Sequence, residues 1–239
     1  IDGVPGTGGK IILHFFNPGG SVTKKLLPTG NVTDIIDLSG NGQITVSIVD
    51  AGNPVVFVRA KDLGLKGSEI YEIDENAEIR KKLECIRSRG AVMLGFALTP
   101  EEASEKSQAV PKIAFVGERQ DFLSVNGRLV RKDHVDLVAR IMSMGTLHKA
   151  FAVTGAICTA GAVNIEGTVV HEMLSNKALV EKQEIRLGHP GGIISVGVSM
   201  EKREGEYEYK EAVLERTARR LMAGYVCIPQ KYFDKAGGN

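Results

Sequence analysis

The sequence predicts an α+β fold in which long strands surround one very apolar helix. Residues 150–163 are almost all small or apolar, and a helix that is apolar on every side has to be buried. Three later segments, residues 184–187, 193–199 and 207–215, have the β-type character of an antiparallel set, the last pair turning near Glu204-Gly205. With 239 residues and 43% hydrophobic content, the chain has ample material for a core.

The first part of the chain is expected to contain strands separated by turns. Residues 10–16 form an apolar segment between glycine-rich turns, which predicts a strand. Residues 21–31 are rich in Gly, Pro and Thr and are expected to form a loop. Residues 43–49 alternate apolar and polar positions, and residues 55–58 form a short apolar run typical of a buried strand.

The middle of the chain adds helical segments. Residues 78–93 carry apolar side chains at helical spacing, which predicts an amphipathic helix. Residues 112–116 predict another buried strand, and residues 121–130 a hairpin turning at Asn126-Gly127. Asp133 is a suitable cap for a further helix, whose apolar face would contain Leu137, Val138, Ile141 and Met142.

Composition excludes several classes of protein. The net charge is +1, from 30 basic and 29 acidic side chains, which argues against a partner bound through bulk charge, whether nucleic acid or a membrane surface. No apolar run has the length of a membrane span. The three cysteines, Cys85, Cys158 and Cys227, lack CxxC spacing. We therefore expect no metal site, and a reducing, cytoplasmic compartment.

Both ends of the chain carry sequence features that bear on how much of the protein is present. The chain opens on Ile1 without an initiator Met, so we expect the interior of a longer polypeptide. Residues 221–228 read as a last strand, apolar on both faces and closed by Pro229. Such a strand needs cover on both sides.

Two segments together predict a carboxylate site. The first turn of the apolar helix, with Thr154 and Gly155, has N–H groups that need partners or an anion. A Gly/Pro loop, Arg186–Gly192, holds a lone imidazole, His189. Each residue also has a structural interpretation: Thr154 as an ordinary N-cap, and His189 as a loop residue bonded to backbone.

The neighbours of these segments have the same two interpretations. Lys149 lies close to the helix start and could pair with a carboxylate, although surface lysines are commoner. Asn53 lies in a Gly-Asn-Pro turn, which is first of all a turn-forming sequence. Cys158, within the apolar helix, is expected to be a buried core thiol without a catalytic role.

Several strings, in this order, resemble the family of 2-methylaconitate cis-trans isomerase and methylitaconate Δ-isomerase, whose relatives include oxalomesaconate tautomerase. The resemblance runs over nearly the whole chain. The strings are Leu27-Pro28-Thr29-Gly30-Asn31, residues 51–58, residues 111–116, Ser143-Met144-Gly145, Gly188-His189-Pro190 and Arg216-Thr217-Ala218-Arg219.

This resemblance implies a diaminopimelate epimerase-like fold, with two similar domains that each curl a mostly antiparallel sheet around a central helix and bind substrate between them. The family's first domain supplies a catalytic Lys and a Cys in a Ser-Gly-Asn-Cys-Gly-Asn loop, and neither motif occurs here. Residues 1–221 are thus expected to be the second domain alone. Residues 222–239 would return to the missing N-terminal domain.

The implied chemistry is allylic proton transfer on a small unsaturated di- or tricarboxylate, which needs no cofactor. The expected catalytic residues lie outside this chain, and the resemblance assigns carboxylate binding to Gly188, His189 and the loop around them. This chain has Gly191 where many relatives have Ser. The set of expected substrate-binding residues is completed by Thr154, Gly155, Lys149 and Asn53.

Two alternatives stay open. The chain could be a non-catalytic carboxylate-binding or structural domain of the same fold. A phenazine-biosynthesis-like isomerase of the same superfold is disfavoured by the Gly188-His189-Pro190 and Arg216–Arg219 strings. The exposed final strand is also expected to support a homo-oligomer, because unpaired edges associate.

Overall fold

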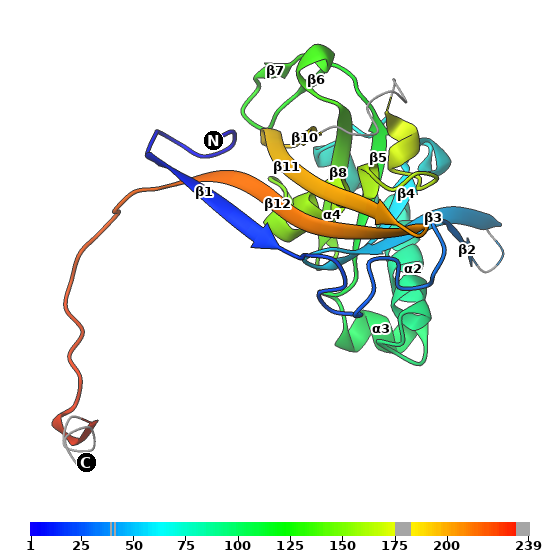
Figure 1. The fold of residues 1–239 in the computed structure, drawn as a ribbon, viewed down its shortest axis with the longest axis horizontal. Coiled ribbons are helices and arrows are strands. Elements are labelled where there is room, and N and C mark those ends of the chain that lie inside the picture. The colour runs from blue at the N-terminus through cyan, green and yellow to red at the C-terminus, as the bar shows by residue number, and fades with distance from the viewer. Residues whose placement is uncertain (39, 41, 175–182, 233–239) are drawn as a thin grey trace.

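One mixed sheet organises the molecule. The computed structural model describes residues 1–38, 40, 42–174 and 183–232. The main sheet has the order β1-β12-β11-β10-β8-β5-β4-β3-β2, with β9 paired to β8 (Figure 1). Its strands are β1 (Gly9–Phe16), β2 (Asp34–Asp37), β3 (Gln43–Asp50), β4 (Pro54–Arg59), β5 (Lys112–Glu118), β8 (Leu137–Ser143), β9 (Thr146–Leu147), β10 (Glu184–His189), β11 (Gly192–Arg203) and β12 (Glu206–Ala218).

The sheet is mostly antiparallel, in agreement with the predicted α+β class. Only β10 with β8 and β4 with β5 run parallel among the pairs of the described strands. A separate hairpin, β6 (Phe122–Leu123) with β7 (Leu129–Val130), turns through residues 124–127 as predicted. Short 3-10 helices lie between the longer elements and after the last strand. They are η1 (Ala60–Leu63), η2 (Lys132–His134), η3 (His171–Met173) and η5 (Gln230–Tyr232).

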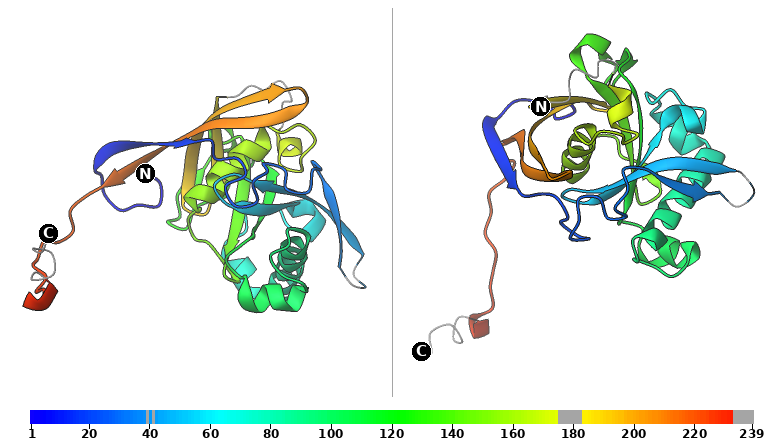
Figure 2. Two further views of the ribbon diagram at one scale, coloured as in Figure 1. Left: turned by 60° about the horizontal axis from the view of Figure 1, so that its bottom comes forward. Right: turned by 45° about the vertical axis from the view of Figure 1, so that its right-hand side comes forward.

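The apolar helix is buried as the sequence predicts. Helix α4 (Val153–Val163) begins three residues later than expected, and its residues from Gly155 to Val163 are all buried. One apolar cluster joins α4 to strands from β3 to β12, each of which lies one strand in from an edge of the sheet. The sheet therefore curls around this helix, as the right-hand view of Figure 2 shows.

A second layer of helices covers the other face of the β3–β5 part of the sheet. It consists of α1 (Tyr71–Glu75), α2 (Ala77–Met93) and α3 (Pro100–Lys106). The Asn76 side chain caps α2 by accepting from the Ile79 amide. Leu83 and Ile86 of α2 belong to a cluster that includes Val56 of β4. Strands covered on both faces have apolar side chains on both, which explains the apolar run of β4.

The helix expected after Asp133 is wrong: residues 137–143 form strand β8. Its side chains alternate between two clusters, because Leu137, Ala139 and Ile141 face α4 while Val138 faces the β6–β7 hairpin. A strand buried on both faces gives a continuous apolar run, which periodicity alone does not separate from a buried helix. Asp133 lies in η2 instead.

The strand expected at residues 221–228 is also wrong in this structure. Beyond Ala218 the chain leaves the sheet and extends away from it without regular secondary structure as far as Pro229 (Figures 1 and 2). Among the described residues no strand lies beside it, so its backbone has no ladder to join. Leu221, Met222, Tyr225 and Val226 are strongly exposed as a result. No helix of the described residues is long and apolar enough to span a bilayer.

Candidate functional site

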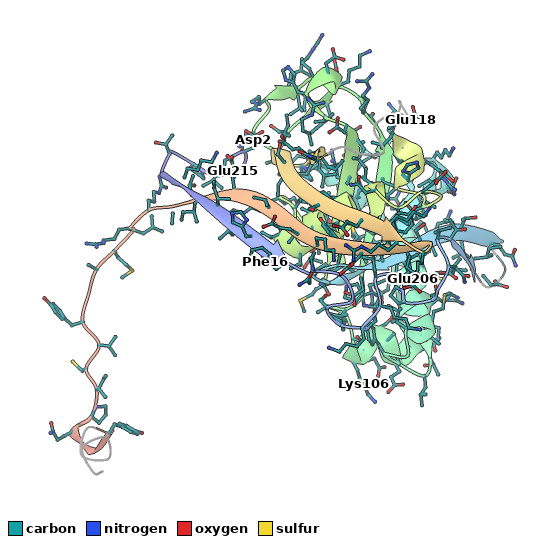
Figure 3. All side chains as sticks on the ribbon, viewed as in Figure 1. Asp2, Phe16, Lys106, Glu118, Glu206 and Glu215 are labelled. Atoms are coloured by element: carbon teal, nitrogen blue, oxygen red, sulfur yellow. The ribbon has the colours of Figure 1, made fainter. Side chains whose placement is uncertain are left out.

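The main sheet opens between β11 and β12, and a hollow lies at this opening. The two strands pair only as far as Val196 and Leu214. Beyond them β11 continues with β10, whereas β12 continues with β1. The hollow has a volume of about 860 Å³. Its lining includes Ile1, Asp2, Val4, Ala150, Phe151, Val153, Glu184, His189, Ile193, Ile194, Ser195, Glu215 and Arg216, of which Figure 3 labels Asp2 and Glu215.

His189 forms the inner wall of this hollow from the end of β10. Only 4% of the residue is exposed, and its ring lies 6.3 Å from the Phe151 ring, centroid to centroid. Its Nδ1 accepts a hydrogen bond from the Gly191 amide at 3.1 Å, which leaves the ring proton on Nε2 when the imidazole is neutral. Burial, followed by the charge of Arg140, lowers the pKa of His189 to about 4.

The start of α4 lies beside His189. Ala152 occupies the N-cap position without a side-chain cap, so the first-turn amides keep their capacity for an external acceptor. Phe151 and Val153 line the hollow. Thr154, one residue further, lies against the turn before β4, since a β-carbon at Gly52 would stand 3.5 Å from Thr154 Cβ. Asn53, half-buried, follows in that turn.

Arg216 supplies a cation on the opposite wall. It lies near the end of β12 and is half-buried, and burial lowers the pKa of its guanidinium. Its Nη1 donates to the Glu215 carbonyl at 2.7 Å, and no ion pair joins it to a carboxylate within the described residues. In the sequence, Arg216 belongs to one of the strings that carry the family resemblance and was not predicted as a site residue. A basic residue interrupting the apolar β12 pattern on the helix-facing side was the available signal.

The other charged groups of the hollow are mostly paired. Asp2 accepts from the Ile193 amide at 2.8 Å and from both terminal nitrogens of Arg128 at 2.9 and 3.0 Å. Glu215 pairs with Lys10 of β1. The exposed edge of β11 thus already binds one carboxylate, that of Asp2, through a backbone N–H.

The predicted site residues do not all meet in the hollow. His189 and Gly191 lie together, with the Gly191 amide bound to the imidazole. Gly188 has the opposite orientation, because a β-carbon there would stand 2.8 Å from Cε1 of Phe122 in the β6–β7 hairpin. Lys149 is directed toward α1, where its Nζ lies 2.5 Å from Asp74 Oδ2 and 5.0 Å from the centroid of the Tyr71 ring. Gly155 packs on Ile141 within the core.

No three His, Cys, Asp or Glu side chains of the described ranges come together as a metal site would require. Cys158 is fully buried, and burial raises the pKa of its thiol, which donates to the Val49 carbonyl. It matches the expected core thiol. The hollow presents hydrogen-bond donors and the Arg216 guanidinium to a ligand, together with the carboxylates of Asp2, Glu184 and Glu215.

Comparison with known proteins gives a consistent set of relatives. The chain is 45% identical over 230 residues to 3-methylitaconate isomerase of Eubacterium barkeri, covering 95% of this chain and 59% of that protein. It is 34% identical over 234 residues to 2-methyl-aconitate isomerase of Shewanella oneidensis, covering 96% and 58%. The chain therefore spans somewhat more than half the length of these curated relatives.

A solved structure agrees with the sequence matches. The crystal structure of a methylitaconate-delta-isomerase superimposes with a TM-score of 0.84 at 44% sequence identity, over 95% of this chain and 57% of that one. The family model described as PrpF protein matches residues 1–229. Because that match covers nearly the whole chain, this protein belongs to the PrpF family.

Proposed function

We propose that this chain is the carboxylate-binding part of an isomerase that moves an allylic proton on small unsaturated di- or tricarboxylates, such as 2-methylaconitate or methylitaconate. The observation that carries the proposal is the half-buried Arg216, without a carboxylate partner among the described residues, across the hollow from His189 and the uncapped start of α4. Two separate anion-binding walls suit a ligand with at least two carboxylates.

The proposed chemistry needs these donors when charge develops. A base removes a proton from a carbon beside an alkene and a carboxylate. The electron pair then spreads through the alkene into that carboxylate, and preorganised donors stabilise the added charge. Return of a proton at another carbon, or after bond rotation, gives the isomer. His189 Nε2–H, the first-turn amides of α4 and Arg216 are the donors assigned to this task, and no cofactor takes part.

The proton-transfer groups are assigned to the part of the relatives' length that this chain does not span. In that arrangement, a diaminopimelate epimerase-like pair of domains encloses the substrate, with a Lys and a Cys provided by the N-terminal domain. The hollow would face that domain. Residues 222–239 would then pack on it.

Carboxylate binding is the first test. Methylitaconate and 2-methylaconitate are titrated into the 239-residue chain, and the resonances of His189 and of the first turn of α4 are followed by NMR. Replacement of Arg216 by Gln removes a charged donor, a loss of about 1.5–3 kcal/mol, or about a tenfold to hundredfold weaker Kd. Arg203→Gln, near the far end of β11 and exposed, is the matched control and keeps the wild-type Kd. Equal Kd values for both variants would contradict the assignment.

Turnover is the second test. The chain alone, incubated with either acid in deuterated buffer, should show no proton exchange by NMR. When the chain is mixed with the N-terminal portion of the Eubacterium barkeri relative, the acid should incorporate deuterium at its allylic carbon. Exchange by the chain alone would contradict the assignment of the proton-transfer groups to the other domain.

A second candidate is a carboxylate-binding domain without catalysis. One observation favours it: among the described residues, neither a Lys nor a Cys lines the hollow. Binding without exchange, even in the mixed sample, would support this alternative.

A further inference from the structure

Arg140 is a cation at the centre of the sheet. It lies on β8, its exposure is 0%, and its hydrogen bonds all go to backbone carbonyls rather than to a carboxylate. A buried charge is costly unless it is fully hydrogen-bonded. The acceptors are Glu69 (2.8 Å from Nε), Ser68 (2.9 Å from Nη2), Ala139 (2.9 Å from Nη1) and Gly188 (3.2 Å from Nη1).

One of these acceptors belongs to the residue immediately before His189. The guanidinium also lies 5.1 Å from the centroid of the Phe122 ring. The same ring packs against Gly188, where an added β-carbon would stand 2.8 Å from Cε1. Arg140, Phe122 and Gly188 therefore form one packed group behind the strand from which His189 projects toward the hollow.

We propose that Arg140 is a positioning residue for His189: by binding the Gly188 carbonyl it fixes the peptide that carries the imidazole. Its positive charge also disfavours a second charge on the ring. The positioning itself does not depend on the proposed function. The role of this positioning in carboxylate binding does rest on the proposed function.

The surroundings of His189 lower its pKa on balance. Burial is the largest cause of its lowered pKa, and Arg140 is the next. Arg216 acts in the same direction, whereas Asp2 and the backbone of Ile193 act in the opposite one. With Nδ1 accepting from Gly191, the neutral ring presents Nε2–H as a donor.

The neutral form matters for the chemistry. A neutral imidazole donates a hydrogen bond without readily losing its proton. An imidazolium with a pKa of about 4 would instead readily give up its proton. It would protonate the developing carbanion in place of the groups assigned to proton transfer. Burial, and after it the charge of Arg140, therefore keep His189 as a donor for binding and not as an acid at this wall of the hollow.

The test is an NMR pH titration of the His189 Cε1 proton in the 239-residue chain. In Arg140→Met the pKa of His189 is expected to rise, because the substitution removes a positive charge that disfavours the imidazolium. The matched control is Arg87→Met. Arg87 is likewise buried and donates to the carbonyls of Ser107 and Ala103, but it lies on α2. Its loss should leave the His189 titration unchanged.

Arg140→Lys separates charge from geometry. It keeps the positive charge but loses the forked donors, so the pKa of His189 should stay low. The amides of Gly188 and Gly191 should shift, and the contact between the rings of His189 and Phe151 should weaken in the NOE spectrum. If Arg140→Met does not fold, this variant decides, and unchanged amides with an unchanged NOE would overturn the proposal.

An unaltered His189 titration in folded Arg140→Met would overturn it as well. A rise of equal size in Arg87→Met would do the same, because it would reflect general loosening. The titration of His189 is measured without ligand, so its result does not depend on the proposed function. The proposed function is contradicted by a different result, namely that the wild-type chain binds neither acid.

Discussion

Tyr209 packs on Gly161 so closely that a β-carbon at position 161 would stand 2.6 Å from the ring carbon Cε1. The same tyrosine donates its hydroxyl to the Ile157 carbonyl at 3.2 Å, one turn earlier on α4. Burial raises the pKa of that hydroxyl, so it remains a donor. The Tyr209 side chain thus connects strand β12 to the central helix, and its close packing requires a glycine at position 161.

Gly161→Ala should therefore destabilise the fold. The added methyl group meets the Tyr209 ring, and overpacking of this kind costs about 1–3 kcal/mol, against a gain in helix propensity of about 1 kcal/mol. Urea unfolding should show a net loss. Gly9→Ala on β1, where nothing lies within 4 Å of the new carbon, is the control. An equal free energy of unfolding for the two variants would refute the close packing.

Acid should destabilise the chain through His189. Its pKa is lowered from 6.5 to about 4 in the folded state. Between these values the unfolded chain binds a proton and the folded chain does not, so stability falls as the pH drops through this window and is unaffected above it. The loss of free energy of unfolding is at most about 3.4 kcal/mol below pH 4.

Denaturant melts at several pH values measure this slope. His189→Gln should flatten the curve between pH 6.5 and pH 4. A wild-type slope in His189→Gln would assign the acid sensitivity to another group.

The three thiols should react in the order of their exposure. Cys227 is exposed, Cys85 half-buried and Cys158 buried. Burial also raises the pKa of Cys158, so little thiolate is available for attack. Mass spectrometry after a pulse of maleimide should find Cys227 modified first, and Cys158 only in denaturant. Early labelling of Cys158 would mean that α4 is not enclosed.

The apolar tail should drive association. Leu221, Met222 and Tyr225 are exposed, and β1 is an edge strand of the sheet, a position that pairs readily with other chains. Light scattering should show concentration-dependent dimers or larger assemblies for the full chain. A version ending at Arg220 should associate less. A strictly monomeric full chain would rule this out.

Local patterns predicted the strands whose two faces differ and the helix that is apolar all round. They failed at β8, where Arg140 interrupts an apolar run. Its burial depends on the carbonyls of Ser68 and Gly188, which are remote in sequence. They also failed at residues 221–228, because a strand needs a neighbour and none of the described strands provides one.

For the site, the sequence indicated His189 and the helix start. It did not show that Lys149 is committed to Asp74 on α1, or that Gly188 faces Phe122. These are long-range pairings without a local signal. Arg216 did leave a local signal, a basic residue in the apolar pattern of β12, but its place in the hollow depends on the opening between β11 and β12.

The pairing of β1 with β12 has a consequence for synthesis. Gly9 pairs with Ala218, so β1 has no partner during synthesis until β12 has been translated. At about 5–20 residues per second, this delay lasts on the order of ten to forty seconds. During that time Ile12 and Phe16, which stay exposed even in the folded chain, are open to chaperones. A stall before β12 would leave a nascent chain with an unpaired apolar strand.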